Sequence, residues 1–121
     1  MTNLVIKRVY DDALPTDGYR ILVDRLWPRG ISKEIAKIDE WTKKVAPSTE
    51  LRKWFHHDPE KWMEFSEKYK EELKKNNIAE TSWEVHKKQE KITLVYAAKD
   101  EKHCQPVVLL KYLELVTKRE D

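Results

Sequence analysis

The feature that most constrains the fold of this chain is an apolar run at residues 20–26 that passes directly into a charged loop. Ile21 and Val23 fall on one side of an extended chain and Leu22 on the other, as in an inner strand of a parallel sheet. An arginine guanidinium is a rigid fork of donors that needs an anion or a carboxylate as its partner. The run therefore predicts a buried strand that ends at a ligand site. The charged or aromatic residues that follow it are Asp24, Arg25, Trp27 and Arg29.

Two further strands are expected around this run. Residues 92–98 form the most strand-like segment of the chain, and residues 4–10 form a strand with one face partly exposed. The connector at residues 11–18 is too short for a helical crossover. The first two strands are therefore either antiparallel neighbours or parallel with an unusual loop.

Helical periodicity dominates the middle of the chain. A stripe of apolar residues at three- and four-residue spacing predicts a first helix; it comprises Ile31, Ile35, Ile38, Trp41 and Val45. Ser48 is expected to cap a short second helix, and Asp58 with Pro59 to start a long third helix that stops at Asn77. Thr81 and Glu84 form a capping box that predicts the start of a fourth helix. Residues 107–118 read as a last, largely apolar helix.

The order strand, helices, strand, helix predicts an α/β fold. We expect a small, mostly parallel sheet with helices packed on it. The expected single domain covers residues 1–121, with its core at about residues 4–116.

Composition excludes several classes of protein. The charge is balanced, with 24 lysines and arginines against 22 acidic residues, which argues against a dedicated nucleic-acid binder. Two glycines leave no glycine-rich phosphate loop.

The chain has no apolar run of the roughly 20 residues that span a bilayer, and the first charges follow the first apolar residues, the reverse of a secretion signal. We therefore expect a cytoplasmic protein without a membrane partner, and the single cysteine, Cys104, suits a reducing compartment.

Several longer motifs in the chain resemble those of one protein family. They are residues 8–11 (RVYD), 17–31 (DGYRILVDRLWPRGI), 46–48 (APS), 51–55 (LRKWF), 57–59 (HDP) with Trp62, and 96–100 (YAAKD) with His103. Together they resemble the YeaO-like branch of the bacterial domain-of-unknown-function family number 488, over about residues 5–113. The resemblance implies a cytoplasmic α/β domain without a settled reaction, in a family with some metal-associated members.

The chain departs from its longer relatives in that family. Those relatives carry a strand end reading VDVR and a second reading CAEK, followed by CHR. Asp24 and Arg25 match the first pattern, and Lys99 and Cys104 match parts of the others. Tyr96 stands in place of the first cysteine, and residues 105–106 replace the His-Arg pair. A mechanism or metal site built on two cysteines is therefore excluded by this sequence.

The two strand ends are expected to form one site. If the strands that end at Leu26 and Ala98 run parallel, their carboxyl ends meet at the edge where open α/β sheets bind ligands. The last helix begins near Gln105, so its positive end faces the same space and favours an anion. The guest we expect is phosphate, sulfate or a carboxylate. The alternative is that the charged residues form structural ion pairs.

Each residue of this predicted site has an expected role. The ligand-binding candidates are Arg25, Trp27, Arg29 and Gln105, of which the arginines would orient the anion. The catalytic candidates are Asp24, Lys99, Asp100, His103 and Cys104. In an enzyme, Lys99 would neutralise developing charge, and His103 or Asp100 would move protons. Whether the protein is an enzyme is left open.

Cys104 and the histidines support other hypotheses. A thiol at a helix start beside His103 would have a lowered pKa and act as a nucleophile, whereas a buried cysteine acts as a small hydrophobe. His57, His103 and Cys104 are candidate ligands of a metal- or haem-associated protein, although histidines near helix starts also bond to backbone. A third hypothesis is a protein or nucleic-acid interaction module that uses Trp27, Trp54 and the lysine-rich faces of the helices. The sequence gives no indication of the oligomeric state.

Overall fold

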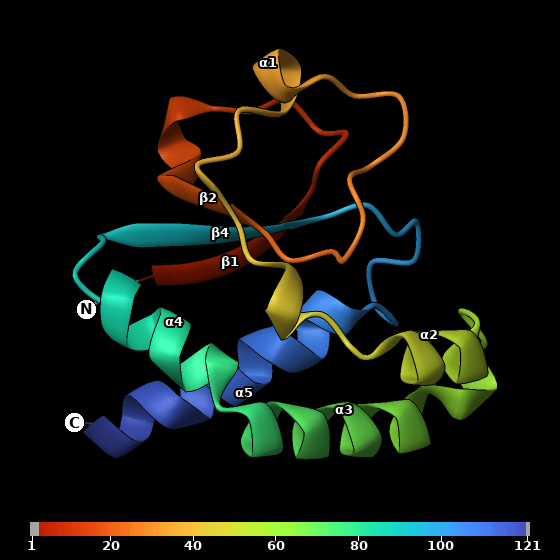
Figure 1. Cartoon of the computed structure of the whole chain (residues 1–121). Helices are drawn as coiled ribbons and strands as arrows, with labels where there is room; N and C mark the ends of the chain where they lie inside the picture. Colours follow the sequence, from red (N-terminus) through yellow and green to blue (C-terminus); the bar gives the residue numbers. More distant parts are fainter. Residues whose placement is uncertain (1–2, 121) are drawn as a thin grey trace.

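A parallel sheet forms the centre of the molecule in the computed structural model, which describes residues 3–120 and the side chains of residues 3–116 (Figure 1). The strand order is β1-β4-β2-β3. Leu94 of β4 pairs with Ile6 of β1 on one side and with Ile21 of β2 on the other. The predicted α/β class and the mostly parallel sheet are confirmed. The strands are β1 (Asn3–Arg8), β2 (Tyr19–Leu22), β3 (Glu40–Trp41) and β4 (Lys91–Tyr96).

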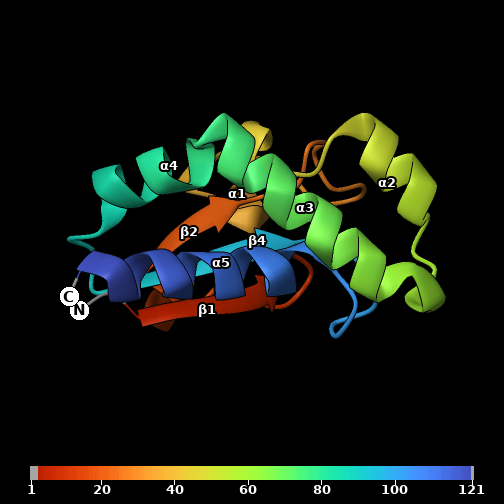
Figure 2. The same ribbon diagram turned by 90° about the horizontal axis from the view of Figure 1, so that it is seen from below.

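The longer helices lie on one side of the sheet. Figure 2 shows α5 running over β1 and β4, with α3 and α4 beside it, while α2 lies toward the carboxyl ends of the strands. The main core fills the space between these helices and the sheet, and Phe65, Tyr69 and Leu73 enter it from α3. Within residues 3–120, no helix has the length and apolar character needed to cross a membrane. The helices of this layer are α2 (Thr49–Phe55), α3 (Trp62–Asn76), α4 (Ile78–His86) and α5 (Gln105–Glu120), and the short turn η3 (Pro59–Lys61) precedes α3.

The opposite face of the sheet carries a thinner layer. It consists of η1 (Pro15–Asp17), α1 (Lys33–Ala36) and the loops beside them, whereas η2 (Lys43–Val45) lies on the side of the longer helices, where Val45 enters the main core. Arg20 is buried here and donates to the Ala36 carbonyl, with Nη2 and O 2.8 Å apart. Its Nη1 also lies 2.7 Å from Asp17 Oδ2, and Lys7 Nζ lies 3.0 Å from Asp17 Oδ1. Buried charge on this face is therefore paired, which tethers η1 and α1 to the sheet.

The prediction of a first helix over residues 31–45 is wrong. The stripe at residues 31–45 forms one helical turn, α1, and then the strand β3, which pairs Trp41 with Leu22 of β2. Lys37 ends α1 in a left-handed conformation with φ 49°. Ile35 is left exposed, whereas Ile31, Ile38 and Trp41 pack on the second, smaller core. Tertiary pairing with β2 has overridden the helical periodicity.

Of the two alternatives for the first two strands, antiparallel neighbours is wrong and the parallel arrangement with an unusual loop is confirmed: β4 lies between β1 and β2, and their connector links two parallel strands without a long helix. The predicted start of the fourth helix needs correction. α4 begins at Ile78, not at the predicted capping box, and Thr81 donates from its hydroxyl to the Asn77 carbonyl. Asn77 does stop α3 in a left-handed conformation, as predicted.

Candidate functional site

A pocket of about 340 Å³ lies at the carboxyl edge of the sheet. Six chain segments build it: the residues after β1, the residues after β2, the residues after β4, the end of α2 with His57 beyond it, α3 through Phe65, and the start of α5. β2 and β4 are adjacent and parallel, so their ends open into the same space. The predicted meeting of the two strand ends is confirmed. Of the predicted site residues, Asp24, Arg25, Trp27, Arg29, His57, Cys104 and Gln105 line the pocket.

Asp24 holds the two strand ends together. Its Oδ2 accepts a hydrogen bond from the Ala97 amide at 2.9 Å. Gln105 Nε2 donates to the Val23 carbonyl at 2.9 Å and approaches Asp24 Oδ1 at 3.4 Å. Burial raises the pKa of the Asp24 carboxyl to about 6, although the Ala97 amide and the Arg52 charge act to lower it. Asp24 is therefore a half-buried carboxyl whose pKa lies well above its ordinary value of 3.8.

Arg25 is committed to the backbone. Its Nε and Nη2 donate to the Pro47 carbonyl at 3.3 and 3.2 Å, and Nη2 also donates to the Ala46 carbonyl at 3.3 Å. Tyr69 donates from its hydroxyl to the neighbouring Val45 carbonyl. Arg25 thus lines the pocket while fixing the segment that leads into α2.

Arg52 was not among the predicted site residues, yet it lines the same pocket. Its Nε is buried and has no hydrogen-bond partner. The sequence signal was present in the LRKWF motif, because Arg52 lies three residues before the buried Phe55 and so shares its face of the helix. An arginine on the inward face of a short helix indicates a site or a buried ion pair. Among the described residues, no carboxylate lies within ion-pair distance of this guanidinium.

The outer rim of the pocket comes from the loop after β2. Arg29 is exposed, and its carbonyl accepts a hydrogen bond from the Tyr10 hydroxyl at 2.8 Å. Trp27 is half-buried rather than free: its indole N–H donates to the Ile31 carbonyl at 2.8 Å, and its ring meets the edge of Trp41 with centroids 5.5 Å apart. Trp27 therefore offers one wall to the pocket while packing on the smaller core.

The end of α2 is strained where it borders the pocket. His56 and His57 both have left-handed backbones, with φ 47° and 56°. Two consecutive residues other than glycine in this region cost free energy, on the order of 1–2 kcal/mol each. The turn directs His57 to the pocket wall, where its ring lies 6.2 Å from that of Phe55.

Cys104 is buried at the start of α5. Burial raises the pKa of its thiol to about 11, in the direction opposite to the sequence prediction. The Val107 amide and the Tyr96 hydroxyl act to lower this pKa but do not outweigh burial. The thiol also donates weakly to the Glu101 carbonyl at 3.7 Å. Cys104 is therefore a neutral thiol at pH 7, so the alternative of a small buried hydrophobe fits the structure better.

Three of the predicted catalytic residues lie outside the lining of the pocket: Lys99, Asp100 and His103. Lys99 is exposed. Asp100 accepts from the backbone amides of Lys102 and His103, each at 2.9 Å, and its Oδ2 lies 2.9 Å from His103 Nδ1. The His103 ring packs edge-on against Trp62 of α3, with centroids 5.5 Å apart. These contacts organise the loop before α5.

The predicted metal ligands are not assembled. His57 and Cys104 line the pocket, but His103 is turned to Asp100 and Trp62. In the part of the chain that the structure describes, no three His, Cys, Asp or Glu side chains are grouped so that they could hold a metal ion.

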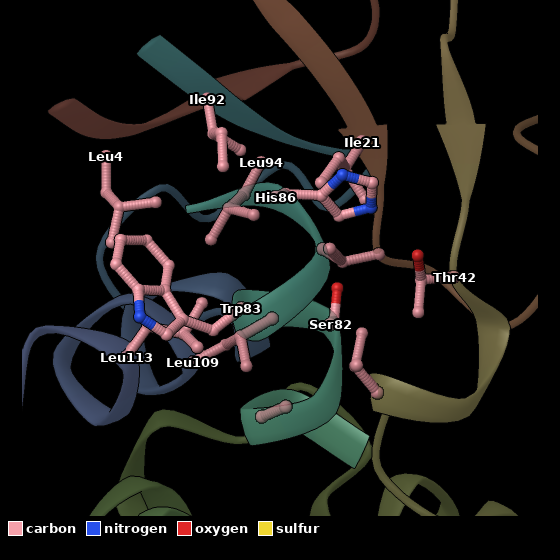
Figure 3. Close-up of a pocket in the computed structure, with 13 residues that line it drawn as sticks. Leu4, Ile21, Thr42, Ser82, Trp83, His86, Ile92, Leu94, Leu109 and Leu113 are labelled. Atoms are coloured by element: carbon pink, nitrogen blue, oxygen red, sulfur yellow. The ribbon is translucent and has the colours of Figure 1, made fainter. Parts of the chain in front are cut away.

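Figure 3 shows a second cavity, between α4 and the sheet, with a volume of about 30 Å³. A space of this size has room for no more than a water molecule or two. Its walls are mainly apolar, and Thr42, Ser82 and His86 add polar groups. His86 is already engaged, because its Nε2 lies 2.9 Å from Glu40 Oε1. The pocket at the carboxyl ends of the strands has room for a small molecule and gathers the charged residues, so it is the candidate functional site.

Comparison with known proteins places the chain in a family. It is 45% identical to the uncharacterized protein YeaO of Escherichia coli K12 over 111 residues, which is 92% of this chain and 96% of YeaO. The uncharacterized proteins Rv3073c of Mycobacterium tuberculosis H37Rv and Mb3100c of Mycobacterium bovis are each 53% identical over 72 residues, which is 60% of this chain and 61% of theirs. No solved structure matches the chain. A family model described as "Inactive DUF488-N3 subclade" matches residues 3–121, so the chain belongs to the DUF488 family and to that subclade.

Proposed function

We propose that this protein binds a small anionic molecule in the pocket at the carboxyl edge of its sheet, with Arg52 as the main anchor. The observation that carries the proposal is Arg52, which lines the pocket and whose buried Nε has no hydrogen-bond partner. A buried charged donor that lacks a partner costs more than the roughly 1–3 kcal/mol typical of a neutral group. An anion in the pocket would give the Arg52 guanidinium a partner of opposite charge.

The surroundings of Arg52 favour an anion. Arg29 and Arg25 line the same pocket, and Arg29 has an exposed side chain that can turn toward a guest. The first turn of α5 also borders the pocket, and the positive end of a helix dipole favours negative charge. A volume of about 340 Å³ is at the lower end of the range for small-molecule sites. Phosphate, sulfate and carboxylates all match the donor fork of a guanidinium.

Binding is favoured over catalysis. Cys104 has a raised thiol pKa, so it does not supply a thiolate at neutral pH. The subclade to which the chain belongs carries the description "inactive". We propose that the pocket recognises its guest without converting it.

Titration with sulfate at constant ionic strength tests the proposal. We expect sulfate to shift the NMR signals of residues around the pocket, including the Nε–H of Arg52, in a saturable way. Arg52→Gln should weaken sulfate binding at least tenfold, because a hydrogen bond to a charged group contributes about 1.5–3 kcal/mol.

Lys53→Gln is the matched control, because it removes one positive charge from the next residue of α2, which is exposed and does not line the pocket. This variant should bind sulfate as the wild type does. If both variants lose the same affinity for sulfate, the binding depends only on the net charge of the protein and not on Arg52. The absence of saturable shifts for sulfate, phosphate and acetate would contradict the proposal.

A further inference from the structure

We infer that the guest of this pocket carries an ammonium group close to its anionic group, as an α-amino acid does, and that Asp24 receives the ammonium while Arg52 receives the anion. The inference rests on the proposed function and narrows its class of ligand.

Asp24 and Arg52 line one pocket without closing on each other. Both groups line the same pocket, and the charge of Arg52 acts against the rise in the pKa of Asp24 that burial causes. Within the described residues, however, no ion pair within 4.0 Å joins them, and Arg52 Nε remains without a partner. A carboxylate and a guanidinium held apart in this way can be bridged by a molecule that has a donor for one and an acceptor for the other.

The Asp24 carboxylate has capacity for a ligand. One oxygen, Oδ2, accepts from the Ala97 amide at 2.9 Å. The other, Oδ1, is approached by Gln105 Nε2 at 3.4 Å, and that amide makes its shorter bond, 2.9 Å, to the Val23 carbonyl. A carboxylate offers about four acceptor positions. Oδ1 therefore can accept strong hydrogen bonds from an ammonium group.

The other charged groups of the pocket leave these two roles to Asp24 and Arg52. Arg25 directs its donors to the Pro47 and Ala46 carbonyls. Arg29 and His57 are exposed at the rim. Among the described residues that line the pocket, Asp24 is the only carboxylate. A cationic group on the ligand therefore has one partner of opposite charge.

The remaining walls are apolar and aromatic. Phe55 and Phe65 stack with centroids 4.2 Å apart behind the pocket, and Trp27 forms the wall toward the loop after β2. An uncharged side chain of the ligand would pack on these rings. The combination matches an amino acid with an apolar or aromatic side chain better than it matches inorganic phosphate, which carries no positive charge for Asp24.

Two matched pairs of probes test the inference by NMR titration or calorimetry at pH 7.5. L-Phenylalanine is compared with 3-phenylpropanoate, and L-alanine with propanoate, because each pair differs only by the ammonium group. We expect the amino acid to bind about tenfold more tightly in at least one pair, which corresponds to one charge-assisted interaction. 2-Phenylethylamine, which lacks the carboxylate, should bind more weakly than either partner of the first pair.

Asp24→Asn separates the ammonium site from the anion site. The variant keeps an oxygen acceptor for the Ala97 amide but has no negative charge. It should therefore bind L-phenylalanine and 3-phenylpropanoate with about equal affinity. The affinity for 3-phenylpropanoate should rise, because a repelling carboxylate has gone. If wild-type protein binds both amino acids no more tightly than their deaminated partners, the inference of an ammonium site at Asp24 is wrong, while the proposal of an anion site at Arg52 is unaffected. If sulfate, propanoate and 3-phenylpropanoate all fail to bind, the proposed function itself fails.

Discussion

Asp24 shows how a single residue joins the fold to the site. Its carboxylate closes the gap between the strand ends by accepting from the Ala97 amide, and it also faces the pocket. Burial raises its pKa to about 6 from the value of 3.8 for a free side chain. The native state therefore binds a proton more tightly than the unfolded chain does, and the stability that this gives is complete below pH 3.8 and is lost as the pH rises through 6.

Asp24→Asn should remove this contribution of Asp24 to the pH dependence of stability. Asparagine does not titrate, so the free energy of unfolding of the variant minus that of the wild type should rise by about 2 kcal/mol between pH 4 and pH 7. Urea unfolding of both proteins at several pH values measures the difference. A difference that stays constant with pH would show that the Asp24 carboxyl is not perturbed.

The roles of single residues are only partly predictable from the sequence. The charge-rich loop after residues 20–26 correctly indicates the place of the pocket. It does not show that Arg25 bonds to carbonyls 21 and 22 residues away, because nothing local encodes that contact. Arg52 escapes prediction for the same reason: its position in the pocket depends on how α2 packs at the end of the sheet.

At the scale of elements, the entry into β2 depends on Gly18. Its backbone, with φ 69° and ψ −137°, is one that glycine adopts far more readily than other residues. A Cβ atom at this position would lie 2.5 Å from the carbonyl oxygen of Lys91, the first residue of β4. Since that oxygen belongs to the backbone of the central strand, it has little freedom to move. The close approach of the two segments therefore requires the absence of a side chain.

Gly18→Ala should lower the free energy of unfolding by about 3 kcal/mol or more, from the unfavourable backbone and the clash together. Gly30→Ala is the control, because Gly30 has a similar φ of 75° but a Cβ atom there would meet open space, with nothing within 4 Å. That change should cost about 1–2 kcal/mol. Urea unfolding compares the two variants, and equal losses would contradict the close approach of β2 to β4.

The element boundaries show where local pattern stops being sufficient. The α3 helix is predictable because Phe65, Tyr69 and Leu73 follow its inward face and Asn77 ends it. Residues 31–45 carry the same periodicity but lie partly in β3 and are divided between the two cores, with Val45 in the main one. The competing interaction, strand pairing with β2, involves residues about 19 positions away, so a local helical pattern does not exclude it.

At the scale of the whole molecule, the order of the strands creates the site. β4 lies between β1 and β2, so the chain that leaves β4 passes the end of β2 before it enters α5 (Figure 1). Alternation of strands and helices predicts the parallel sheet, but the position of β4 in it is a non-local property that periodicity does not encode. The helices on one face and the thin layer on the other leave the carboxyl edge as the place where loops from several elements converge.

The most direct test of anion binding is a crystal structure with selenate, an analogue of sulfate whose anomalous scattering identifies it. We predict one ordered selenate in the pocket at the carboxyl edge, within hydrogen-bond distance of the Arg52 guanidinium. In crystals of Arg52→Gln grown and soaked in the same way, that position should be empty of anomalous density. Selenate found only elsewhere on the surface, or in the pocket without contact to Arg52, would contradict the account.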